Sequence, residues 1–140
     1  MKILMLDIDG VLNSEKTLQR TTAGYIGIDP HLAFLIGKIT LAIPDLKIVL
    51  SSTWRLWHES KKEVEKRVCP LFDVTPHLRN GSRGEEIQAW LDAHPEVEKY
   101  AILDDDTDML ESQLPNFFQT FFHEGLTEEI MEKVIEHLKD

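Results

Sequence analysis

Short apolar runs alternate along the chain with longer stretches that carry charged residues and helix-capping signals. The apolar runs occupy residues 2–6, 47–50, 71–74, 100–103 and 117–122. Runs of this length, bounded by polar and turn-forming residues, are typical of strands buried in a sheet. The stretches between them predict helices at residues 31–42, 59–68, 82–93 and 127–138. Strands and helices are therefore expected to alternate along most of the chain.

Local signals fix where the predicted helices begin. Asp29-Pro30 has the form of an N-cap followed by a proline in the first helical position. Ser82 and Glu85 have the S-x-x-E spacing of a capping box. Strand–helix alternation predicts an α/β fold in three layers, in which helices cover both faces of a mainly parallel sheet of five strands. With 140 residues and no repeat or linker, the chain is expected to form one domain over residues 1–140.

Polar residues follow three of the predicted strands directly. Asp7 and Asp9 follow the first, Ser51 and Ser52 the second, and an aspartate run beginning at 104 follows the fourth. Ligands of parallel α/β sheets bind beyond the carboxyl ends of the strands, so these side chains are expected to meet at one edge. Several carboxylates meeting there would repel one another. A divalent cation with oxygen ligands would relieve the repulsion, and Mg²⁺ is the expected ion.

Composition narrows the classes of function. The formal net charge of −10 argues against an extended nucleic-acid-binding surface but leaves room for a small cationic pocket. The single cysteine, Cys69, excludes an intramolecular disulfide and a cysteine-rich zinc site. No apolar run is long enough to span a membrane, and Asp7 and Asp9 interrupt what would have to be a secretory signal. A cytoplasmic location is therefore predicted.

The strand-end motifs resemble those of the haloacid dehalogenase superfamily. Residues 7–12, DIDGVL, resemble its first motif, D-x-D-x-[TV]-[LIV], and Ser51 after "IVL" resembles its second. Asp104 and Asp105 after "AIL" resemble its acidic fourth motif. The segments "VLSSTWR", "RGEEIQAWL", "AILDDDTDM" and "GLT" are most similar to the domains of this superfamily found beside RNA-repair enzymes. The resemblance implies a Rossmann-like three-layer sandwich.

The resemblance also implies a phosphatase mechanism. Asp7 would be the nucleophile that forms an aspartyl-phosphate, and Asp9 would be the general acid and base. Ser51 would donate a hydrogen bond to the phosphoryl group. Mg²⁺ would be held by Asp7, the backbone carbonyl of Asp9, and Asp104 or Asp105. An acid at Asp9 favours phosphate esters over carbon–halogen bonds, because an alkoxide leaving group must be protonated.

The third motif departs from the family pattern, and the fourth leaves the metal ligands open. The third motif normally carries a lysine, and Arg83 stands in its place, where its guanidinium can still grip phosphate. Arg55, just after the second motif, is a further candidate for a phosphate contact, and Ser52 is expected to bind phosphate and to cap the next helix. The register of the fourth motif leaves Asp104, Asp105 and Asp108 as alternative metal ligands.

The lengths of the connecting segments predict an open site. Neither 12–47 nor 74–83 has room for a cap domain, so the site is expected to be capless or minimally capped. The loop 13–28 is expected to flank the site and to contact substrate. An open site admits small esters, nucleotides, polynucleotide ends or a phosphorylated protein, and the main hypothesis is a Mg²⁺-dependent phosphomonoesterase acting on nucleotide or polynucleotide termini. The alternatives are a non-catalytic phosphate-binding module and a receiver-like phosphoacceptor domain.

Overall fold

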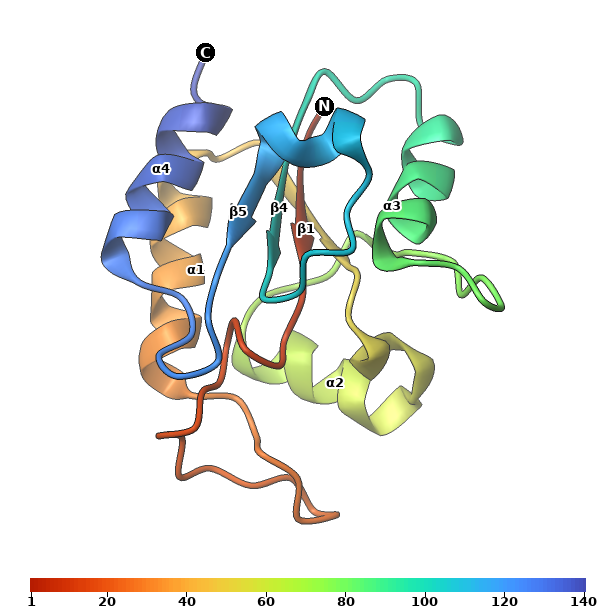
Figure 1. The fold of residues 1–140 in the computed structure, drawn as a ribbon. Coiled ribbons are helices and arrows are strands. Elements are labelled where there is room, and N and C mark those ends of the chain that lie inside the picture. Colours follow the sequence, from red (N-terminus) through yellow and green to blue (C-terminus); the bar gives the residue numbers. More distant parts are fainter.

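The strands form one five-stranded parallel sheet in the order β3-β2-β1-β4-β5 (Figure 1). The computed structural model describes residues 1–140. β1 lies at the centre and pairs in parallel with β2 on one side and β4 on the other. The strands are β1 (Lys2–Leu6), β2 (Leu46–Leu50), β3 (Asp73–Val74), β4 (Lys99–Asp104) and β5 (Phe117–Gln119). The predicted α/β class and five-stranded sheet are confirmed, and every pairing is parallel.

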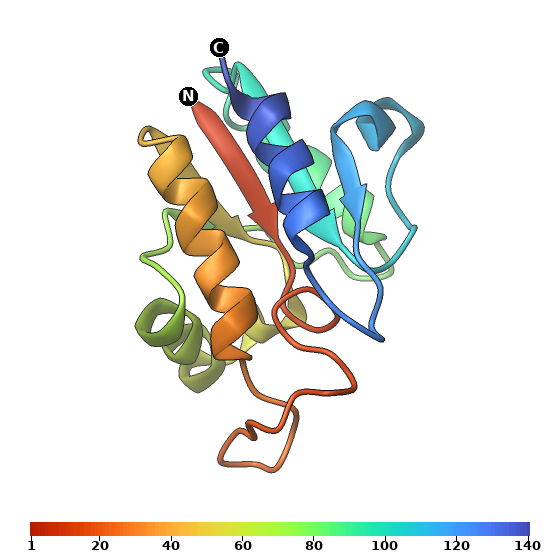
Figure 2. The same cartoon turned by 90° about the vertical axis from the view of Figure 1, so that its left-hand side faces the viewer.

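Helices cover both faces of the sheet, which completes the predicted three layers. α1 and α4 lie side by side on one face and α3 on the other (Figures 1 and 2). Successive residues of β1 point to opposite faces, so Leu4 and Leu6 join the core under α1 and α4 while Ile3 packs with α3. The helices are α1 (Pro30–Ala42), α2 (His58–Arg67), α3 (Arg83–Asp92) and α4 (Glu128–Leu138), with short 3₁₀ helices η1 (Thr53–Leu56) and η2 (Glu111–Asn116).

The capping signals in the sequence act as predicted. Asp29 accepts a hydrogen bond from the His31 backbone N–H, and proline occupies the start of α1. Ser82 and Glu85 form a reciprocal capping box at the start of α3. Each cap satisfies backbone N–H groups that have no partner inside the helix. The second of these caps fixes where Arg83 begins α3.

The structure differs from the predicted elements at two edge strands and at η1. β3 contains only Asp73–Val74 of the predicted 71–74, and β5 ends at Gln119 instead of continuing to 122. β5 stops early because the chain reverses in a tight turn after Thr120, where the backbone N–H groups of Glu124 and Gly125 donate to the Phe121 carbonyl. η1 forms because Ser52 caps it by accepting from the Trp54 N–H.

No cap domain covers the carboxyl edge of the sheet. The segments between β1 and α1 and between β3 and α3 hold no helix, which confirms the predicted capless architecture. The first of these segments carries only a small antiparallel bridge between Arg20 and Ile26. None of the helices combines the length and the hydrophobicity that a membrane crossing needs.

Candidate active site

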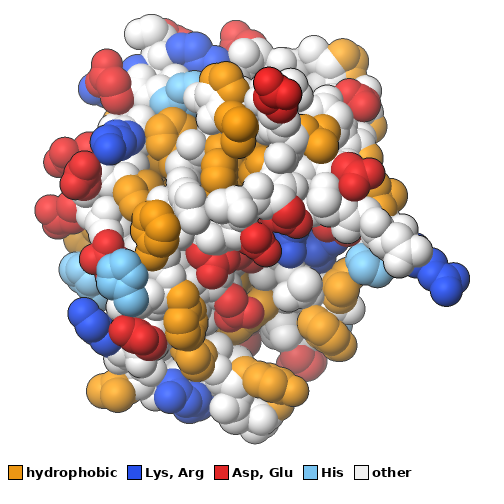
Figure 3. Space-filling model, viewed as in Figure 1, with side chains coloured by type: hydrophobic (Ala, Val, Ile, Leu, Met, Phe, Trp, Pro, Cys, Tyr) orange, Lys and Arg blue, Asp and Glu red, His pale blue; other side chains and the backbone are white.

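The polar residues at the strand ends meet in one cavity. Its volume is about 180 Å³, and no hydrophobic residue lines it. In Figure 3, which has the orientation of Figure 1, acidic side chains gather at the centre of the visible surface with a basic side chain beside them. The lining residues are Asp7, Asp9, Thr53, Arg83, Asp104, Asp105, Asp106 and Asp108. The predicted convergence of the first motif, the fourth motif and Arg83 therefore occurs at the carboxyl edge of β1 and β4.

Three carboxylates crowd together at the floor of this cavity. One oxygen from each of Asp7, Asp104 and Asp105 lies within 4.8 Å of the others. Burial, and then the neighbouring Asp104 carboxylate, raises the pKa of Asp7 well above its ordinary value. Burial raises the pKa of Asp104 to about 6 and also raises the pKa of Asp105. Ionising these three carboxylates therefore costs free energy in the folded protein, and a bound cation would offset that cost.

This arrangement fits Mg²⁺. Mg²⁺ prefers oxygen ligands and is commonly held by one or two carboxylates together with water or substrate phosphate. Asp7, Asp104 and Asp105 supply such oxygens at the carboxyl ends of β1 and β4, which pair directly in the sheet. The Asp9 carboxylate is not part of this group, so the predicted contribution of Asp9 through its backbone carbonyl stays a prediction.

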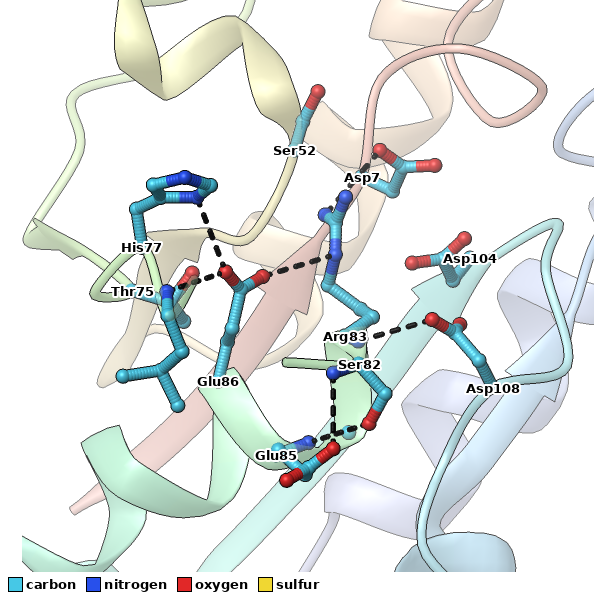
Figure 4. Close-up of polar contacts among 12 residues, drawn as sticks. Asp7, Ser52, Thr75, His77, Ser82, Arg83, Glu85, Glu86, Asp104 and Asp108 are labelled. Carbon is cyan, nitrogen blue, oxygen red and sulfur yellow. Dashed lines mark hydrogen bonds and ion pairs between the residues drawn. The ribbon is translucent and has the colours of Figure 1, made fainter. Parts of the chain in front are cut away.

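Arg83 lies beside the predicted nucleophile. Its Nη1 is 3.8 Å from Oδ1 of Asp7, and this buried nitrogen has no hydrogen-bond partner. Its backbone N–H donates to Oδ2 of Asp108 at 3.0 Å, which links the start of α3 to the acidic segment after β4 (Figure 4). A buried guanidinium nitrogen without an acceptor is costly unless a ligand supplies one. Arg83 is therefore placed to bind an anion next to Asp7.

The serines after β2 differ from each other in their contacts. The Ser51 N–H donates to the Leu6 carbonyl at 2.9 Å, which places Ser51 beside Asp7, and its buried hydroxyl has no partner. Ser52 caps the short helix η1 and not the helix predicted at 59–68, which begins after Trp57 without a side-chain cap. Neither serine is among the residues that line the cavity. Thr53, which the sequence analysis did not single out, lines the cavity. The serine-threonine run gives the signal for a polar strand end but not for which hydroxyl faces the site.

The Arg55 guanidinium is engaged by the protein itself. It donates to the backbone carbonyls of Ser52 at 2.8 Å, Thr75 at 2.9 Å and Pro76 at 3.2 Å. Its Nη2 also pairs with Oε2 of Glu86 at 3.0 Å. Arg55 does not line the cavity, so these contacts give it a structural place behind the site rather than the predicted contact with phosphate.

Glu86 connects Arg55 to Arg83. This buried carboxylate lies 3.7 Å from Nε of Arg83 and 3.5 Å from Nδ1 of His77, and it accepts from the Leu78 N–H at 3.0 Å (Figure 4). The sequence analysis missed Glu86, because a glutamate in the first turn of a helix is commonly explained by the helix dipole. Its contacts hold the Arg83 side chain from the side opposite Asp7.

Two side chains from distant parts of the sequence hold the carboxylate of Asp9. Oδ1 accepts from Nδ2 of Asn13 at 2.9 Å, and Oδ2 accepts from Nε1 of Trp54 at 3.2 Å. The intervening turn requires Gly10, whose φ is +83° and whose missing Cβ would lie 2.1 Å from Oδ2 of Asp105. The sequence analysis missed both donors, because tryptophan is more often a packing residue.

The fold and the site together define a phosphatase-like module of the haloacid dehalogenase superfamily. A family model described as "HAD domain in Swiss Army Knife RNA repair proteins" matches residues 3–131, and the chain belongs to this family. The match confirms the superfamily and the finer placement that the sequence motifs predicted. No curated protein and no solved structure matched the chain.

Proposed function

We propose that this protein is a Mg²⁺-dependent phosphomonoesterase that works through a phosphoenzyme on Asp7 and acts on nucleotide or polynucleotide terminal phosphates. The observation that carries the proposal is the position of Asp7. It lies 3.8 Å from a guanidinium nitrogen of Arg83 that has no acceptor and within 4.8 Å of carboxylate oxygens of Asp104 and Asp105. The surroundings of Asp7 therefore offer a donor for a phosphate oxygen and oxygen ligands for a cation.

Asp7 and Asp9 divide the chemistry. An Asp7 oxygen attacks phosphorus and forms a P–O bond, while the bond from phosphorus to the leaving oxygen breaks. Asp9 gives its proton to that leaving oxygen. In the second half-reaction, Asp9 takes a proton from water as the water attacks phosphorus, and phosphate leaves Asp7. The hydrogen bonds from Asn13 and Trp54 hold the Asp9 carboxylate in one orientation for both transfers.

Arg83 and Ser51 stabilise the phosphoryl oxygens as donors. Each carries a buried polar atom without a partner, Nη1 of Arg83 and Oγ of Ser51. Donors that are already in position where negative charge gathers lower the barrier without reorganising. A planar guanidinium can donate two parallel hydrogen bonds to phosphate, so Arg83 takes the place of the lysine of the third motif.

Asp7, Asp104 and Asp105 are the residues proposed to hold Mg²⁺, together with the carbonyl of Asp9. When bound, the ion neutralises the carboxylates and polarises the phosphoryl oxygens. Asp108 stays the alternative ligand, although its Oδ2 already accepts from the Arg83 backbone.

The open architecture supports a bulky substrate. No cap domain closes over the cavity, so a polynucleotide end can approach Asp7 from solvent. The family description, which places such domains in RNA repair proteins, is consistent with this class of substrate. The single Cys69 thiol is free, which is compatible with the predicted cytoplasmic location.

The proposal is tested by measuring phosphate release with and without Mg²⁺ from an aryl phosphate and from oligonucleotides phosphorylated at the 3′ or the 5′ end. Turnover that requires Mg²⁺, and that Asp7→Asn abolishes, is expected. Tight phosphate binding without any turnover would favour the non-catalytic binding module. Stable phosphorylation of Asp7 without hydrolysis would favour the receiver-like alternative. Either result would overturn the proposed function.

A further inference from the structure

A second cavity lies next to the candidate active site. Its volume is about 110 Å³, and the loop between β1 and α1, together with α2 and Trp54, forms its walls. Figures 1 and 2 both show this loop and α2 at the end of the molecule where the strands have their carboxyl ends. The side chains that matter for its chemistry are Gln19, Arg20, Thr21, Trp54, Glu63 and Arg67. The sequence analysis predicted only that this loop would flank the site.

Two hydrogen bonds connect Asp9 to the walls of the second cavity. The Trp54 indole, which lines this cavity, donates to Oδ2 of Asp9 at 3.2 Å. Nδ2 of Asn13 bonds both to Oδ1 of Asp9 at 2.9 Å and to the carbonyl of Gly27 at 3.1 Å, and Gly27 is a second wall residue. The proposed general acid therefore stands between the two cavities.

The second cavity is positively charged in a strongly acidic protein. It contains the guanidinium groups of Arg20 and Arg67 and the single carboxylate of Glu63, whereas the chain as a whole carries a formal charge of −10. Arg67 pairs with Glu63 through Nε only. Arg20 donates to the carbonyls of Thr17 and Gln19 through Nη1 only. Each guanidinium keeps donors that have no partner in the protein, as an anion-binding site needs.

The direction of the chemistry makes this cavity relevant to substrate. A general acid must lie within hydrogen-bond reach of the oxygen that it protonates, so the leaving group departs on the Asp9 side of the phosphorus. Beyond Asp9, on that side, lie Trp54 and the two arginines. A leaving group long enough to pass Asp9 would bring its next charged group to Arg20 and Arg67.

We propose that the second cavity is a subsite for a second phosphate on the leaving group, and that the substrate is the phosphorylated end of a single-stranded oligonucleotide. The internal phosphodiester next to the terminal phosphate binds Arg20 and Arg67. This proposal rests on the proposed phosphatase function. It narrows the proposed substrates to oligonucleotide ends and adds a binding site whose two arginines lie outside the motif segments.

The test compares kcat/KM for three substrates: an aryl phosphate, a nucleoside monophosphate, and a dinucleotide with a terminal phosphate, in 3′ and 5′ forms. Wild-type protein is expected to prefer the dinucleotide in one of the two forms. In the double variant Arg20→Gln/Arg67→Gln, the loss on that dinucleotide is expected to exceed the loss on the aryl phosphate roughly tenfold, mainly through KM. The control is Lys133→Gln on α4, which removes one positive charge, as each arginine substitution does. It is expected to leave the ratio of kcat/KM for the dinucleotide to kcat/KM for the aryl phosphate unchanged.

Two readouts separate this proposal from the proposed function. If no substrate turns over, the phosphatase function fails, and the affinity of the dinucleotide for the wild type and the double variant decides the subsite. Equal losses on all three substrates, or no preference for the dinucleotide, would overturn the subsite while the phosphatase stands. If a nucleoside bisphosphate binds as tightly as the dinucleotide, the substrate is a small bisphosphate and the assignment of an oligonucleotide end is overturned. Thermal unfolding of the double variant checks that it folds.

Discussion

Asp104→Asn is expected to stabilise the metal-free protein at neutral pH and to weaken its response to Mg²⁺. Burial raises the pKa of Asp104 from 3.8 to about 6, which means that the folded state disfavours the ionised carboxylate. The asparagine can still accept the Asp106 N–H that Oδ1 of Asp104 accepts at 3.0 Å, so the local turn is kept. The substitution therefore removes the charge with little change of shape.

The magnitude follows from linkage. At about 1.4 kcal/mol for each tenfold change in the protonation constant, this rise in pKa costs the folded protein roughly 3 kcal/mol once Asp104 is ionised. The cost is absent below pH 3.8, grows as the pH rises, and is complete above about pH 6. Because local relaxation and water penetration reduce it, we expect Asp104→Asn in EDTA to gain about 1–3 kcal/mol at neutral pH. Near pH 4 most of this gain is expected to disappear.

Urea unfolding in EDTA, measured at both pH values, gives the free energy of unfolding for the wild type and the variant. A parallel titration with Mg²⁺ at neutral pH gives the increase in Tm, which is expected to be large for the wild type and small for Asp104→Asn. A variant that is less stable than the wild type in EDTA at neutral pH would refute the reasoning. So would a variant that gains as much from Mg²⁺ as the wild type does.

Three further substitutions test the side chains that hold the site. Glu86→Gln removes the charge beside Nε of Arg83, so kcat/KM is expected to fall about tenfold, mainly through KM, in steady-state assays. Trp54→Phe removes the donor to Asp9, and kcat is expected to fall roughly tenfold with a shifted pH–rate profile, because the general acid is no longer held. Gly10→Ala is expected to destabilise the protein by about 2 kcal/mol or more in urea unfolding, because its φ of +83° is unfavourable and the methyl group has no space.

Each of these variants has a matched control elsewhere in the chain. Glu136→Gln and Trp57→Phe change exposed side chains and are expected to leave the kinetics unchanged. Gly37→Ala adds a methyl group that meets nothing within 4 Å inside α1, so it is expected to stabilise the protein by up to about 1 kcal/mol. If a control variant lost as much activity or stability as the variant it is matched to, the effect could not be assigned to the site. A pH–rate profile unchanged in Trp54→Phe would remove Trp54 from the site.

Local signals were sufficient to predict the scaffold and the acidic part of the site. β1 and the caps at Asp29 and Ser82 were predictable because apolar runs and capping residues act over a few positions. Asp7 and Asp104 could be brought together from sequence because parallel strands end at a common edge. The short edge strands were less predictable, since a few pairings with one neighbour define them.

The residues that orient the site could not be predicted, because their partners are set by how loops pass one another. Trp54 reaches Asp9 from 45 positions away. Arg55 stands next to the second motif and was expected to contact phosphate, but its donors are taken by carbonyls of the segment after β3 and by Glu86. The path of that segment has no signature in the sequence around Arg55.

The most direct test of the central claim is to trap the phosphoenzyme. Asp9→Asn lacks the general base for the second half-reaction, while an aryl phosphate needs little help from an acid in the first. Acid-quenched Asp9→Asn, incubated with an aryl phosphate and Mg²⁺ and then digested for mass spectrometry, is predicted to carry a phosphoryl group on Asp7. A phosphoryl group on Ser51, or hydrolysis with no label on Asp7, would contradict the account.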